Sequence, residues 1–212
     1  MSIRSYFMAK FYDSSMKKIE EQSFSKWRRE LLSGIKGDVL EIGSGTGINL
    51  SHYPGSISSL VLTEPDAHMH KLLKKAVIDS GRNDIKTNDS SASQLNFQDG
   101  EFDAVVSTLV LCSVESPEQA LKEIKRVLKP DGKLYFLEHV VASDAPGLIK
   151  WQRFFQPFWK SMCGNCHLTR DTEAEINNVG FKFELIERVN SIGGPPIVTP
   201  TIKGVASKKA GS

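Results

Sequence analysis

The stretch that decides the fold is VLEIGSGTG, which runs from Val39 to Gly47. A hydrophobic, strand-like run leads directly into three glycines at alternate positions, 43, 45 and 47. A turn needs glycine where φ is positive or where a ligand must approach the backbone closely. One glycine would mark an ordinary turn, so three at alternate positions predict a loop shaped around a ligand.

Segments with the pattern of strands alternate with segments with the pattern of helices around this loop. We expect strands at 37–43, 58–64, 84–89, 101–111, 133–140, 181–189 and 201–208, and helices at 14–33, 67–80, 116–129 and 171–179. Strands that alternate with helices predict crossover connections and a parallel, doubly wound α/β sheet. Ligands bind such sheets at the carboxyl ends of the strands. We therefore expect functional side chains at 43–47, 64, 88–92, 107–113 and 138–139.

The glycine loop differs from a dinucleotide fingerprint. Counted from Gly43, G-x-G-x-x-G requires glycine at 48, where the chain has Ile48, and this disfavours a nicotinamide dehydrogenase. Glu64 ends the second strand, and a carboxylate there accepts hydrogen bonds from both hydroxyls of a ribose. An adenosine ligand without a pyrophosphate fits this pattern. S-adenosylmethionine is such a ligand, and its positive sulfonium is compatible with Glu41 and Glu64 beside the loop.

Five segments occur in the order and at the spacing of one enzyme family: VLEIGSGTG, LTEPD, SQLNFQDGEFDAVVSTLVLCSV, EIKRVLKPDGKLYFLEH and GFKFELIERV. With them the chain resembles the class I S-adenosylmethionine-dependent methyltransferases of type 11. TLVLCSV, LEHV and CHLTR are most similar to membrane-associated thiol methyltransferases and bacterial phospholipid N-methyltransferases, in the branch that acts on small molecules, quinones and lipids. The resemblance implies methyl transfer by direct displacement to a small, apolar acceptor, which is a thiol, a lipid amine or a quinone-like phenol.

The resemblance also implies the arrangement of the chain. We expect a Rossmann-like, seven-stranded sheet of order 3-2-1-4-5-7-6, with strand 7 antiparallel and helices on both faces. Residues 1–35 would form a helical cap over the cofactor, residues 36–212 the methyltransferase domain, and about 145–167 a lid over the substrate. The implied cofactor-binding residues are Tyr12, Glu41, Gly43, Ser44, Gly45, Gly47, Glu64, Pro65, Ser91, Ala92 and Thr108. Ser91 and Ala92 stand where the family usually has Asp-Ala, so the adenine contact departs from its pattern.

The methyl acceptor is expected beyond the fourth and fifth strands. His139 ends the fifth strand, and an imidazole with a pKa near ~6.5 can accept a proton from a nucleophile. The residues expected to line the substrate pocket are Cys112, Trp151, Phe155 and Trp159. CGNCH, at 163–167, matches the pattern of a redox pair or of half a zinc site. Because the chain has no second such pair, we expect no metal and interpret these cysteines as a buried or idle pair.

The stretch GLIKWQRFFQPFWK, at 147–160, contains five aromatic residues on one face of a predicted helix. Three interpretations stay open: the face packs on the core, lines an apolar substrate pocket, or lies on a membrane surface, which its flanking Lys and Arg would suit. The basic run KWRR, at 26–29, is interpreted as a solvated helix face rather than a nucleic-acid patch.

The composition narrows the class of protein. The chain has 212 residues, of which 40% are hydrophobic and 25% charged, as expected for one globular domain. A net charge of +2 gives no sign of a nucleic-acid partner. Three cysteines, no apolar run of spanning length and no secretory signal favour a cytoplasmic location. The alternatives are a non-catalytic regulator that binds S-adenosylmethionine or S-adenosylhomocysteine, and a protein or nucleic-acid methyltransferase.

Overall fold

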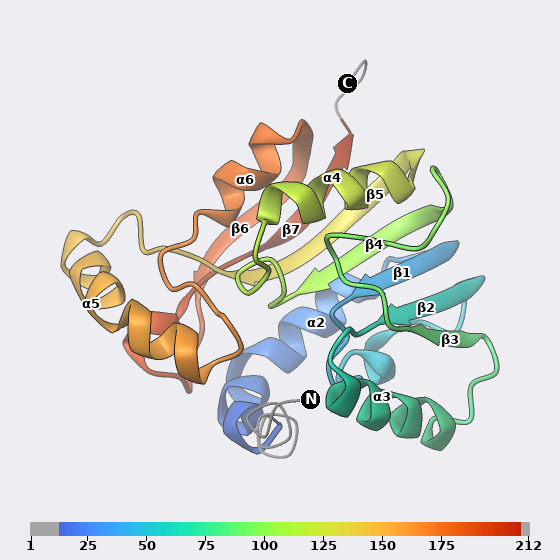
Figure 1. Ribbon diagram of the computed structural model, residues 1–212, viewed down its shortest axis with the longest axis horizontal. Helices are drawn as coiled ribbons and strands as arrows, with labels where there is room; N and C mark the ends of the chain where they lie inside the picture. The colour runs from blue at the N-terminus through green and yellow to red at the C-terminus, as the bar shows by residue number, and fades with distance from the viewer. Residues whose placement is uncertain (1–12, 209–212) are drawn as a thin grey trace.

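The computed structural model, which describes residues 13–208, contains one seven-stranded sheet (Figure 1). Its strands are β1 (Asp38–Ile42), β2 (Ser59–Thr63), β3 (Ile85–Asn88), β4 (Phe102–Thr108), β5 (Leu128–His139), β6 (Phe181–Asn190) and β7 (Pro200–Lys208). They lie in the order β3-β2-β1-β4-β5-β7-β6, and β7 runs antiparallel to both of its neighbours. The predicted fold class, strand order and orientation of the last strand are confirmed.

Helices cover both faces of the sheet. Residues 13–19 are helical and lead through a π-helical turn, η1 (Glu20–Phe24), into α2 (Ser25–Leu32). The others are α3 (Ala67–Asp79), α4 (Pro117–Val127), α5 (Pro146–Met162) and α6 (Thr172–Asn178), with short 3-10 turns η2 (Leu50–His52) and η3 (Pro196–Val198). α4 begins where the sequence predicts, because Ser116 caps its first turn and Pro117 occupies the first helical position.

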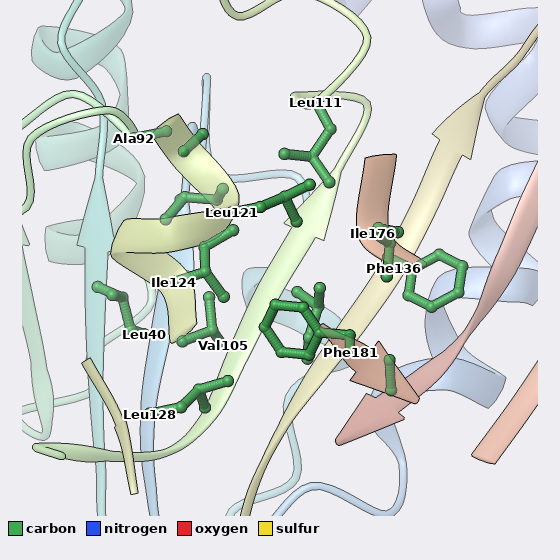
Figure 2. Close-up of a cluster of buried hydrophobic side chains, with 14 of the residues drawn as sticks. Leu40, Ala92, Val105, Leu111, Leu121, Ile124, Leu128, Phe136, Ile176 and Phe181 are labelled. Carbon is green, nitrogen blue, oxygen red and sulfur yellow. The ribbon is translucent and has the colours of Figure 1, made fainter. Parts of the chain in front are cut away.

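The alternating side chains of the strands divide between two hydrophobic cores. Leu40 of β1 and Val105 of β4 pack against Leu121 and Ile124 of α4, together with α6, as Figure 2 shows. The neighbouring residue Val39 points to the opposite face, where it packs with residues of α2 and α3. Since both faces are covered by helices, the sites left for ligands are the loops at the strand ends.

The start of β5 differs from the sequence prediction. β5 starts at Leu128, where this residue pairs with Phe102, and regular pairing resumes only at Lys133 opposite Ala104. The predicted turn containing Pro130 therefore lies inside an irregular stretch of the strand. Proline has no N–H to donate to the ladder, which is why it is tolerated at such an irregularity.

The carboxyl end of the sheet is flanked by the N-terminal helical segment and by α5. Figure 1 shows α5 projecting beyond the sheet on the side to which β5 leads, with the N-terminal segment on the same side. Among the residues that the structure describes, no helix is both long and apolar enough to cross a bilayer.

Candidate cofactor and acceptor site

The glycine loop after β1 has the conformation that its sequence predicts. Gly43, Gly45 and Gly47 all have positive φ, at 56°, 57° and 91°. A Cβ on Gly43 would lie 2.7 Å from Val110, and one on Gly47 would lie 2.9 Å from Leu50. A Cβ on Gly45 would meet nothing within 4 Å. Two of the glycines therefore allow close packing, while the third keeps open the space in which a ligand can approach the backbone.

Glu64 lies directly after β2 and faces this loop. Its Oε2 accepts a hydrogen bond from the Gly45 N–H at 2.9 Å, and its Oε1 accepts one from the Asp66 N–H at 2.9 Å. The side chain is buried, and burial raises its pKa. Each carboxylate oxygen keeps a further lone pair, so the group can still accept hydrogen bonds from two hydroxyls of a ligand.

Glu41 of β1 is fully buried below the loop. Its Oε1 accepts a hydrogen bond from Asn49 Nδ2 at 3.1 Å and its Oε2 accepts one from the Tyr53 hydroxyl at 2.5 Å. Desolvation outweighs these bonds and raises the pKa of Glu41 to about 7. Glu41 therefore holds the residues that follow the loop in place, and its predicted position beside the cofactor stays a prediction.

Arg28 connects the N-terminal helix to the same network. It forms an ion pair with Glu20 at 2.9 Å, and its Nη1 donates to Asn49 Oδ1 at 2.9 Å and to the Thr108 hydroxyl at 2.8 Å. The interpretation of the KWRR run as a solvated face is wrong for this residue, which is 2% exposed. The sequence did contain a sign of this burial, because Arg28 lies four residues after the apolar Phe24 and so on the same face of the helix.

The remaining predicted cofactor residues lie around the ends of β1 to β4. Ser44 is buried in the loop, Pro65 is exposed beside Glu64, and Thr108 ends β4. Ser91 is exposed after β3, while the side chain of Ala92 packs in the core beneath α4. Tyr12 lies outside the described residues. The hydroxyl of Thr46 donates to Asp13 at 2.8 Å, which brings the beginning of the described chain against the glycine loop.

Glu138, the second-last residue of β5, holds the loop that follows β4. Its carboxylate accepts hydrogen bonds from the Ser107 hydroxyl at 2.6 Å and from the backbone N–H groups of Val110 and Cys112. Burial raises its pKa. The predicted pocket residue Cys112 is thereby positioned at the carboxyl end of β4 and is itself buried.

His139 follows Glu138 and is almost fully buried. Its Nε2 lies 3.3 Å from the carbonyl oxygen of Ile197, which can only accept, so this nitrogen carries the hydrogen. Its Nδ1 lies 4.0 Å from the sulfur of Cys166. The fold thus brings Cys166, one of the two CGNCH cysteines interpreted as a buried or idle pair, to the end of β5.

The helix α5 buries a polar residue rather than its aromatic face. Gln152 is fully buried and bonds with the Ala142 N–H at 2.9 Å and with the Ile197 carbonyl at 3.1 Å. Trp151 and Phe155 stack on each other at the surface, with Trp151 58% exposed. The interpretation that this aromatic face packs on the core is therefore wrong. The assignment of Trp151, Phe155 and Trp159 to a substrate pocket stays a prediction.

Comparison with known proteins agrees with this geometry. Residues 40–136 match the family described as "Methyltransferase domain". The chain is 36% identical to human thiol S-methyltransferase TMT1B over 96% of this chain and 85% of that protein. The chain belongs to the class I S-adenosylmethionine-dependent methyltransferases. The methyltransferase is also 34% identical to the ubiquinone/menaquinone biosynthesis C-methyltransferase UbiE of Hahella chejuensis, over 53% of this chain and 48% of that one.

The solved structures agree on the fold of the methyltransferase. It superposes on a methyltransferase from the complex with the Haloferax volcanii Trm112 methyltransferase activator, with a TM-score of 0.73 and 14% identity, covering 99% of both chains. At that identity the likeness concerns architecture alone. It does extend over the whole sheet and its flanking helices, so the described strand order is that of a known methyltransferase fold.

Proposed function

We propose that this methyltransferase transfers a methyl group from S-adenosylmethionine to the sulfur of a small, apolar thiol. The observation that carries the proposal is the imidazole of His139 at the carboxyl end of β5, whose Nδ1 is left to take a proton from a thiol. The 36% identity with a thiol S-methyltransferase over nearly the whole chain supports the same acceptor class.

The residues around the glycine loop fit the cofactor. Glu64 has lone pairs left for the ribose hydroxyls, and the open space at Gly45 permits close approach to the backbone. When bound, S-adenosylmethionine supplies an electrophilic methyl group on a sulfonium. Glu64 would hold the adenosine part, and Thr108 at the end of β4 would lie near the methionine part. The acceptor would therefore enter over the ends of β4 and β5.

His139 is the proposed proton acceptor for the thiol. A thiol with a pKa of about 8.5 is only a few per cent thiolate at neutral pH, and the thiolate is the nucleophile. The Ile197 carbonyl holds the hydrogen on Nε2, so Nδ1 is left to take the proton. Alignment of nucleophile and methyl group and exclusion of water provide the rest of the acceleration.

The test is a methyl-transfer assay with matched sets of small alkyl thiols, amines and phenols. We expect methylation of thiols, and a fall of about a hundredfold in kcat/KM for His139→Asn with unchanged cofactor affinity. The matched control is His167→Asn, which lies next to Cys166 and acts on the loop through its backbone. Preferential methylation of phenols would favour instead the quinone chemistry of the UbiE relative. Equal rates for the two histidine variants would show that His139 is not the proton acceptor.

Cofactor binding is tested separately, by calorimetric titration with S-adenosylmethionine and with NAD. Glu64→Ala should weaken S-adenosylmethionine by about ten- to a hundredfold, because charge-assisted hydrogen bonds to the ribose would be lost. Binding of NAD, or unchanged affinity in Glu64→Ala, would contradict the assigned cofactor site.

We also propose that α5 contacts the surface of an anionic membrane. Its apolar residues Trp151, Phe154, Phe158 and Met162 are between 55% and 72% exposed, and Lys150, Arg153 and Lys160 flank them. Apolar rings beside basic groups suit the boundary between lipid headgroups and acyl chains. α5 projects from the body of the protein, so this face can reach a flat surface (Figure 1).

Co-sedimentation with vesicles tests the membrane contact. We expect the double substitution Phe154→Glu, Phe158→Glu to abolish binding to vesicles that contain anionic lipid. Ile78→Glu on α3 is the control, because Ile78 is 78% exposed and lies outside this face. Binding that survives the double substitution, or that is lost equally with Ile78→Glu, would contradict the proposal.

A further inference from the structure

Residues 163–170, which follow α5, are attached to the loop after β4 by backbone and side-chain hydrogen bonds. The His167 N–H donates to the Cys112 carbonyl at 2.9 Å, and Asn165 Nδ2 donates to the Ser113 carbonyl at 2.6 Å. Arg170 Nη1 donates to two further carbonyls of the same loop, at 2.6 and 2.8 Å. These bonds bring Cys112 and Cys166, which are distant in sequence, into a fixed arrangement.

The two cysteines are neighbours in the fold, because the residue that follows Cys166 donates its N–H to the Cys112 carbonyl, and each thiol shifts the pKa of the other. Neither is in a disulfide in this structure. Cys112 is 2% exposed, whereas Cys166 is partly exposed. Of the two cysteines, Cys166 is therefore the one that solvent reaches.

The surroundings of Cys166 stabilise a thiolate. The thiol of Cys112 donates to its sulfur and the His139 ring faces it, and both lower the pKa of Cys166. The buried Nε1 of Trp159 has no conventional hydrogen-bond partner among the described residues and also lowers this pKa. The pKa of Cys112 is raised, first by its hydrogen bond to Cys166 and then by burial. The pair thus combines an accessible nucleophile with a protonated neighbour.

A metal does not explain the pair. Within residues 13–208, no group of three or more His, Cys, Asp or Glu side chains is arranged to hold a metal ion. Thiolates attack disulfides, and an adjacent second thiol resolves the mixed disulfide that forms. A partly exposed thiolate next to a buried thiol suits this chemistry.

We propose that Cys166 and Cys112 form a thiol–disulfide exchange site that reduces low-molecular-weight disulfides. The Cys166 thiolate attacks one sulfur of RS–SR, so that a Cys166–S–SR bond forms and RS⁻ leaves. The sulfur of Cys112, after losing its proton, then attacks Cys166, so that the Cys112–Cys166 disulfide forms and the second RS⁻ leaves. The two thiol protons of the protein end on the two released thiols. One disulfide is broken and one is formed, with no further reductant in this turnover.

The exchange site lies at the acceptor end of the sheet, so oxidation has a consequence for methyl transfer. A Cys112–Cys166 bond would tie the segment after α5 covalently to the loop after β4. We expect the oxidised protein to bind S-adenosylmethionine as before and to lose methyl transfer until a dithiol restores it. The exchange chemistry itself does not depend on which acceptor is methylated.

The experiment uses the full chain, reduced, freed of reductant and incubated with bis(2-hydroxyethyl) disulfide. Intact-mass and peptide mass spectrometry follow the products after acid quenching. We expect the wild type to lose the mass of two hydrogen atoms, to contain a Cys112–Cys166 link and to release two thiols per chain. Cys112→Ser should stop at a mixed disulfide on Cys166, and Cys166→Ser should leave Cys112 unmodified.

Cys163→Ser is the matched control, because Cys163 lies in the same segment and is also partly exposed. It should react like the wild type. His139→Asn in the Cys112→Ser background should slow formation of the adduct by roughly tenfold near pH 7, because the thiolate loses a stabilising neighbour. A Cys163–Cys166 link, an adduct on Cys163 alone, or reaction of Cys112 in Cys166→Ser would overturn the proposal. Circular dichroism of each variant separates these outcomes from misfolding.

Discussion

Glu41 makes the stability of this methyltransferase depend on pH near neutrality. Burial in β1 raises its pKa from 4.5 to about 7, against the hydrogen bonds from Tyr53 and Asn49. Between these values the folded protein holds a proton that the unfolded chain has released, so the free energy of unfolding falls as pH rises. At about 1.4 kcal/mol per pH unit, the full loss is about 3 kcal/mol.

The measurement compares urea unfolding of the wild type with that of Glu41→Gln at pH 5, 6, 7 and 8. The amide has the same shape and does not titrate, so subtraction of the two curves isolates the proton on Glu41. Roughly a quarter of the stabilisation by the Glu41 proton is already lost at pH 5. From pH 5 to pH 8 we therefore expect the free energy of unfolding of Glu41→Gln to rise by roughly 2 to 3 kcal/mol relative to that of the wild type.

The matched control for this experiment is Glu123→Gln. A hydrogen bond from Arg126 lowers the pKa of Glu123 in the folded protein, so this group is largely ionised throughout this range in both states. Its curve should run parallel to that of the wild type. Parallel curves for Glu41→Gln as well would refute the reasoning, since they would mean that Glu41 is ionised in the folded protein at pH 5.

Other substitutions probe the loop, the buried ion pair and α5. Gly45 and Gly81 both have a positive φ and open space around them, so Gly45→Ala and Gly81→Ala should each lower the free energy of unfolding in urea by about 1 kcal/mol. Only Gly45→Ala should also lose cofactor binding in calorimetry. Arg28→Met leaves Glu20 buried and unpaired, so it should lower the free energy of unfolding in urea by about 3 kcal/mol. Adding Glu20→Gln should recover part of this loss, and no recovery would argue against the ion pair. Gln152→Leu frees buried backbone groups and should speed hydrogen exchange in α5, whereas unchanged exchange would show that another contact anchors this helix.

Local patterns in the sequence determine the fold and the cofactor half of the site. Each strand and helix has a hydrophobic period or a cap that acts within a few residues, as Ser116 and Pro117 do at α4. The glycines at 43, 45 and 47 and the position of Glu64 at the end of a strand are likewise visible in short stretches of the sequence. These features could be predicted because they do not depend on how distant segments meet.

The contacts between distant parts of the candidate site were decided by the tertiary structure. Arg28 belongs to a basic run, yet the packing of its helix buries it against Asn49 and Thr108. Cys166 and Cys112 meet only because the segment after α5 returns to the loop after β4. Such contacts join residues far apart in the chain, and their burial, charge and reactivity depend on the partners that folding supplies. No local periodicity contains that information.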